Sequence, residues 1–176
     1  DVEFEDILPG MNTAWHTSSL LAKTPLLADP PDFYYIAAEY GFGDYPYGIW
    51  LRHNGPVRFI ARTMSAYRIC SNDASWSSGV EGRYDKLTRF MTGAAAMLEA
   101  YRAHVTDPDV LRLVDDNILK WKFQLLYTQG KDKELRRPPY NKLLKTKPLR
   151  FRINNAVKCL FPALHRLYRR KQGYDE

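Results

Sequence analysis

The stretch GFGDYPYGIWLRHNG, residues 41–55, decides how this sequence is interpreted. Asp44 follows a glycine, a proline comes two residues later, and a glycine closes the run. Aspartate is a preferred N-cap, proline is tolerated in the first helical turn, and glycine commonly follows a helix end. The pattern therefore predicts a short helix over about residues 45–54. Its apolar face would carry Tyr47, Trp50 and Leu51.

Segments on both sides of this helix predict strands. Residues 12–21 (NTAWHTSSLL) are rich in Thr, Ser and aromatic residues and have no helical period, and VRFIA (57–61) and SAYRIC (65–70) are rich in β-formers. The order of strand, short helix, strand and strand predicts an α/β body. Three strands cannot form a self-sufficient sheet with both faces covered, so we expect them to be one part of a larger sheet.

The chain changes character near position 83, where helical periodicity begins. Two helices are predicted before Gly130, and a third apolar stripe runs through the basic end of the chain, interrupted by Pro162. The first two stripes consist of Phe90, Ala94, Met97, Leu98 and Tyr101, and of Val110, Val114, Ile118, Trp121 and Leu125. The third consists of Ile153, Val157, Phe161, Leu164 and Tyr168.

Charge is distributed unevenly along the 176 residues. Residues 131–171 hold 14 Lys and Arg against two acids, a net charge of +12, and the remainder carries 12 Lys and Arg against 18 acids, a net charge of −6. Two distant cysteines and four histidines without ligand-like spacing argue against a disulfide framework and a metal site, and indicate a reducing, cytosolic setting. The chain opens on Asp1 in mid-pattern, so we interpret it as a fragment or a processed product.

The motif GDYPYGIWLRHNG, followed by VRFIARTMSAYRICSNDASWS, resembles the second half of bacterial family 2 glycosyltransferases. The likeness runs from about Glu5 to Ser78. It implies an α/β fold, the C-terminal portion of a GT-A (Rossmann-like) domain, followed by a helical C-terminal extension. The expected organisation is an acceptor-side part over residues 1–80, a helix pair over 81–130 and a basic amphipathic tail over 131–176.

Asp44 matches the catalytic base of that family. As such it would take a proton from an acceptor hydroxyl that attacks a nucleotide-sugar with inversion. A helix N-terminus favours the ionised carboxylate that this role needs. The alternative is a plain helix cap without chemistry, and the two roles are compatible because a carboxylate has two oxygens.

The resemblance extends to further site residues, each with a structural alternative. Arg68 matches a residue near the donor phosphates, although it could equally be a strand arginine with a solvated head. His16, Thr17 and Ser18 would contact the acceptor or form a polar sheet face, and Trp76 would stack on a sugar from a serine-rich loop. The family usually has His where this chain has Cys70, a poor ligand for hard cations.

The family uses Mg²⁺ or Mn²⁺ held by an Asp-x-Asp motif, and this chain has no such motif in a matching setting. We therefore expect the metal ligands of the full-length enzyme elsewhere, and an isolated fragment to be inactive. The implied function is sugar transfer to a saccharide or lipid-linked acceptor in cell-surface polysaccharide biosynthesis, in the cytoplasm or at the inner face of the cell membrane.

The basic segment 149–171 combines an apolar stripe with arginines and lysines, as interfacial helices on anionic membranes do. A helix that packs its stripe on the body and solvates its charges would have the same composition. The alternative to an enzyme is accordingly a non-catalytic membrane- or protein-binding module that uses this helix. Nucleic acid is not an expected partner, because aromatic residues are not interleaved with the basic ones.

Overall fold

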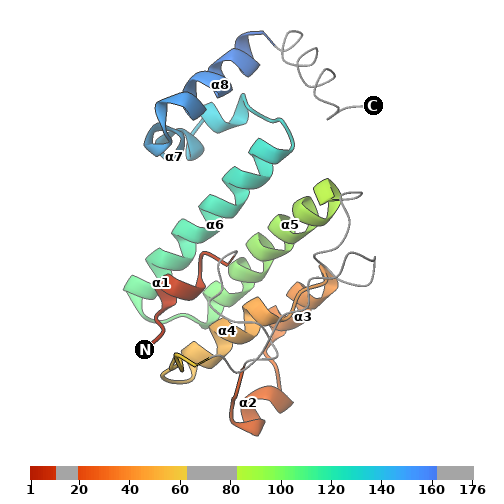
Figure 1. The fold of residues 1–176 in the computed structure, drawn as a ribbon, viewed down its shortest axis with the longest axis vertical. Coiled ribbons are helices and arrows are strands. Elements are labelled where there is room, and N and C mark those ends of the chain that lie inside the picture. Colours follow the sequence, from red (N-terminus) through yellow and green to blue (C-terminus); the bar gives the residue numbers. More distant parts are fainter. Residues whose placement is uncertain (11–19, 63–82, 162–176) are drawn as a thin grey trace. The chain divides into compact units, whose positions relative to one another are not determined.

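The computed structural model describes residues 1–10, 20–62 and 83–161 (Figure 1). The chain divides into two compact units, Asp1–Trp121 and Lys122–Glu176. The described residues of the first unit form α1 Phe4–Ile7, α2 Thr24–Ala28, α3 Asp32–Glu39, α4 Asp44–His53, α5 Arg83–Tyr101, the 3₁₀ turn η2 Arg102–His104, and the part of α6 (Pro108–Thr128) that ends at Trp121.

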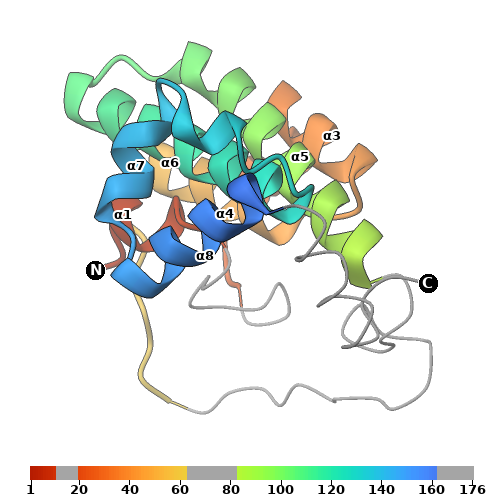
Figure 2. The same ribbon diagram turned by 90° about the horizontal axis from the view of Figure 1, so that it is seen from above.

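Helices α3 and α5 lie side by side in the first unit (Figure 1 and Figure 2). A glycine in the middle of α5 permits their close approach: a Cβ atom on Gly93 would lie 2.5 Å from the Cβ of Tyr40, just after α3. Glycine weakens a helix interior, so its presence here reflects the lack of space for any side chain.

The predicted stripes of α5 and α6 supply part of the core of the first unit. The predicted face of α4 is only partly right, since Tyr45 and Ile49 are buried while Tyr47 and Trp50 are half-buried. Phe33 of α3 is fully buried, and its ring meets that of Tyr101 edge-on, with centroids 5.1 Å apart. Such edge contacts add to the stability that burial supplies. The buried hydrophobic side chains of α5 and of the part of α6 in the first unit are Met91, Ala94, Ala95, Met97, Leu98, Tyr101, Val114, Ile118 and Trp121.

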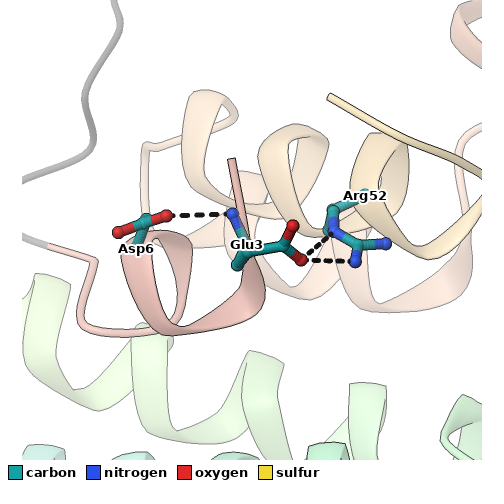
Figure 3. Close-up of polar contacts among 3 residues, drawn as sticks. All are labelled: Glu3, Asp6 and Arg52. Carbon is teal, nitrogen blue, oxygen red and sulfur yellow. Dashed lines mark hydrogen bonds and ion pairs between the residues drawn. The ribbon is translucent and has the colours of Figure 1, made fainter. Parts of the chain in front are cut away.

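An ion pair connects the start of the chain to α4 (Figure 3). The carboxylate Oε2 of Glu3 accepts hydrogen bonds from Nη2 and Nε of Arg52 at 2.6 and 3.2 Å. The backbone N–H of Glu3 donates to Asp6 of α1, and the Arg52 guanidinium lies 5.0 Å from the centroid of the Phe4 ring. Arg52 thus holds α1 against α4 through an ion pair with Glu3 and a cation–π contact with Phe4.

The second unit contains the end of α6, the 3₁₀ turn η3 Glu134–Arg136, α7 Tyr140–Thr146 and α8 Leu149–Leu160. Its small core consists of Phe123, Leu135 and Leu144. Helix α8 joins this core through Phe151, whose ring centroid lies 4.7 Å from that of Tyr127. Among the described residues of α8, only Asn155 is buried, so the helix contributes little apolar surface to the core.

The expected α/β fold of a GT-A (Rossmann-like) domain is wrong for the described residues, which contain no strand or sheet and form helices. Residues 57–61 make only one antiparallel bridge, in which the N–H of Val2 donates to the carbonyl of Val57 at 2.8 Å. Phe59 and Ile60 are exposed. A β-prone sequence forms a strand only when a neighbour pairs with it. The other two predicted strands, 12–21 and 65–70, lie wholly or mostly outside the described residues.

Candidate functional site

Asp44 is the first residue of α4, and Gly43 is the N-cap. Its Oδ1 atom accepts a hydrogen bond from the backbone N–H of Tyr45 at 2.9 Å, and the residue is half-buried. No other described residue donates to this carboxylate. One oxygen is therefore held by the helix that it opens, in the positive end of the helix dipole, while the other is left for an external donor.

Three tyrosine rings lie near the N-terminus of α4. Tyr47 lies one turn after Asp44 and therefore on the same helix face. The centroid of its ring is 4.5 Å from that of Tyr34, which in turn packs 5.7 Å from that of Tyr35. Burial raises the pKa of the Tyr47 phenol, and the neighbouring Tyr34 raises it further. Tyr35 is exposed.

Gly43 allows Tyr34 to reach this position. A Cβ atom at residue 43 would lie 3.2 Å from the Tyr34 hydroxyl and 3.3 Å from its ring. A half-buried carboxylate thus opens the helix whose next turn carries one ring of the Tyr34–Tyr47 pair. A carboxylate can accept the proton of an alcohol, and aromatic faces pack against the C–H groups of a sugar ring.

Asp44 was predicted from the sequence as a site residue, whereas Tyr34, Tyr35 and Tyr47 were not. Tyr47 had a readable signal, since it stands three residues after Asp44 in the same predicted helix. Tyr34 and Tyr35 come from α3, and only the tertiary packing shows that Tyr34 meets α4.

Arg68, Trp76 and Cys70 lie outside the described residues, as do the acceptor candidates His16, Thr17 and Ser18. Their roles stay predictions.

Trp50 has a structural role, as its place on the apolar stripe predicts. Its indole N–H donates to the carbonyl of Leu26 at 3.1 Å, and its ring stacks on that of His53 with centroids 5.7 Å apart. The centroid of its ring also lies 6.2 Å from that of Phe33, in an edge contact. The tryptophan thus joins α4 to α2 and α3.

Two polar contacts of histidines in the first unit join residues far apart in the sequence. Nε2 of His104 lies 2.8 Å from a carboxylate oxygen of Asp32, at the start of α3. This hydrogen bond lowers the pKa of Asp32. Nδ1 of His53 lies 3.3 Å from the hydroxyl of Tyr101, whose pKa burial raises to about 12. Burial lowers the pKa of the His53 imidazole.

Each unit has a cavity of small-molecule size. The one in the first unit has a volume of about 440 Å³ and is lined by residues 1–3 and 52–56. The one in the second unit has a volume of about 410 Å³ and is lined by residues of η3, α7 and α8. Asp44 lines neither of these two cavities.

The described residues contain no group of three or more His, Cys, Asp or Glu side chains that could hold a metal ion. Over the same ranges, every helix is too short or too polar to cross a bilayer. Comparisons with protein-family models, curated proteins and solved structures found no match to this chain.

Proposed function

We propose that the chain is the acceptor-side part of an inverting glycosyltransferase in which Asp44 is the general base. The observation that carries the proposal is the half-buried carboxylate at the start of α4, with one oxygen bound to the Tyr45 N–H, together with the Tyr34–Tyr47 ring pair, whose second member lies one helical turn further along. The motif resemblance around Asp44 supports the same role.

In the proposed reaction, an acceptor hydroxyl oxygen bonds to the anomeric carbon of a nucleotide-sugar. The bond from that carbon to the diphosphate breaks, and the nucleoside diphosphate leaves with the electron pair. Positive charge develops on the attacking oxygen, and Asp44 relieves it by accepting the proton. Attack from the face opposite the leaving group inverts the anomeric centre. Arg68, if it lies near the diphosphate as the resemblance implies, would offset the negative charge that develops there.

The test is sugar transfer by the complete reading frame that contains residues 1–176. The protein is incubated with Mg²⁺ or Mn²⁺ and a panel of nucleotide-sugars, and released nucleoside diphosphate is measured with and without saccharide acceptors. NMR of the glycosidic product gives the anomeric configuration. Acceptor-dependent release with inversion supports the proposal, and retention of configuration contradicts it.

A second proposal concerns the basic second unit, which we propose binds an anionic membrane surface. Helix α8 carries an exposed apolar row, and Arg150, Arg152 and Lys158 lie on the same helix. Apolar contact with acyl chains together with attraction to anionic headgroups is the physical basis of interfacial helices. The row consists of Leu149, Ile153, Val157 and Leu160, and Phe161 continues it.

Co-sedimentation with phosphatidylglycerol vesicles tests this second proposal. The double variant Leu149→Ser, Leu160→Ser should weaken binding, because these side chains are 65% and 71% exposed and support no core. The matched control is Leu21→Ser, Phe59→Ser, which removes two apolar side chains of the first unit that are 83% and 67% exposed. Equal effects of the two pairs would contradict a role for α8.

A further inference from the structure

We propose that the groove between η3, α7 and α8 binds the headgroup of a single anionic phospholipid. This inference rests on the second proposal above, and it replaces diffuse attraction to a surface with a defined site. The groove has a volume of about 410 Å³, within the range of small-molecule sites. Its charged lining residues are all cations, namely Arg136, Lys145 and Arg152, and none of the described residues that line it is acidic.

A buried polar relay fixes one of these cations. Asn155 is fully buried, and its Oδ1 atom accepts a hydrogen bond from Nε of Arg136 at 3.2 Å. Its Nδ2 atom donates to Oδ1 of Asp132 at 2.7 Å, and Asp132 is itself buried. A buried amide must satisfy both of its ends, and here each end has a partner.

The relay uses only one of the five N–H donors of the guanidinium. No other described residue accepts from Arg136. The guanidinium is thus oriented through Nε while its terminal nitrogens are left for a ligand. A planar guanidinium with two free nitrogens suits a phosphate, which accepts paired hydrogen bonds.

Besides the cations and the polar Asn141, the groove is lined by apolar residues, which favour a lipid over a free phosphate. Leu144 forms the buried side of the groove, and Leu149 and Ile153 are exposed along its α8 side. These last two residues begin the exposed apolar row of α8. A groove lined by both cations and aliphatic side chains matches a charged headgroup joined to acyl chains.

Isothermal titration with dihexanoyl phosphatidylglycerol, below the concentration at which it forms micelles, tests the site without a membrane surface. The ligand should bind, dihexanoyl phosphatidylcholine should bind at least about tenfold more weakly, and inorganic phosphate should bind more weakly still, since it lacks apolar contacts. Binding of inorganic phosphate as tight as that of the lipid would overturn the assignment to a lipid. Tighter binding of an acidic amphipathic peptide at the same residues would overturn it in favour of a protein partner.

Two double variants of equal charge separate the groove from the general surface. Lys145→Gln, Arg152→Gln removes two lining cations, and Lys142→Gln, Arg150→Gln removes two exposed cations of the same helices that do not line the groove. The first pair should weaken lipid binding by about tenfold or more, and the second by about twofold or less. Circular dichroism checks that both pairs remain folded.

The outcomes for the site and for the membrane proposal are distinguishable. Equal losses of short-chain lipid binding in the two pairs would overturn the groove. Vesicle binding without any short-chain lipid binding would overturn the groove and leave membrane association standing. Binding of short-chain lipid without vesicle binding would support the groove and contradict the membrane proposal.

Discussion

The phenolic hydroxyl of Tyr45 donates a hydrogen bond to the backbone carbonyl of Leu8 at 2.5 Å. Both residues are buried, and the bond connects the first turn of α4 to the end of α1. Burial also raises the pKa of the Tyr45 phenol well above its ordinary value, so the group keeps its proton and remains a donor. The residue after Asp44 is therefore anchored in the core of the first unit.

Tyr45→Phe should lower the free energy of unfolding by about 1–3 kcal/mol, because the buried carbonyl of Leu8 loses its donor. Urea unfolding followed by circular dichroism measures the change. Tyr35→Phe is the matched control, since Tyr35 is 57% exposed and its change should stay within about 0.5 kcal/mol. A destabilisation no larger than that of the control would contradict the anchoring role.

Gly93→Ala should destabilise the first unit by about 1–3 kcal/mol, although the same change in an open helix stabilises it by about 1 kcal/mol. The reason is the 2.5 Å separation between the new Cβ and that of Tyr40, which forces α3 and α5 apart. Thermal unfolding measures the effect. A higher melting temperature for the variant would show that the two helices do not pack as closely as described.

His53 should make stability depend on pH. Burial lowers its folded-state pKa below the ordinary value of 6.5, so the unfolded chain binds a proton more readily than the folded one. Stability is therefore fully present above about pH 6.5 and declines as the pH falls through the folded-state pKa. Unfolding midpoints measured from pH 8 to pH 5 should fall less in His53→Gln than in the unchanged protein. Parallel curves for the two proteins would exclude His53 as the cause.

Asn155→Ala should destabilise the second unit by about 1–3 kcal/mol, because it leaves the buried Asp132 carboxylate without its donor. The variant also frees the guanidinium of Arg136, so lipid binding should weaken even where the unit remains folded. Thermal unfolding and the short-chain lipid titration measure the two effects. Unchanged stability would mean that Asp132 is satisfied by another donor.

Local signals in the sequence predict α4 closely. The helix expected over 45–54 is found at Asp44–His53, since proline fixes a helical φ in the first turn and glycine permits the positive φ that follows the last turn. The apolar stripe of α5 is equally local, and four of the five residues predicted for it are buried, among them Met97 and Leu98.

Features that depend on distant residues were beyond such signals. The pairing of His104 with Asp32 joins residues 72 positions apart, and the relay through Asn155 puts an amide where a stripe analysis expects an apolar residue. The strand predicted at 57–61 was wrong because β propensity says nothing about whether a neighbour is present to pair with it.

The most direct measurement compares nucleotide-sugar turnover by the complete reading frame with that of its Asp44→Asn variant. Asparagine keeps an oxygen that can accept from the Tyr45 N–H, so α4 should begin normally, but the amide cannot take a proton. Asp29→Asn, an exposed change in the same unit, is the control. We predict a fall in kcat of about 100-fold or more for Asp44→Asn, with the control unchanged. Turnover that survives Asp44→Asn would leave Asp44 as a helix-end residue and contradict the proposed function.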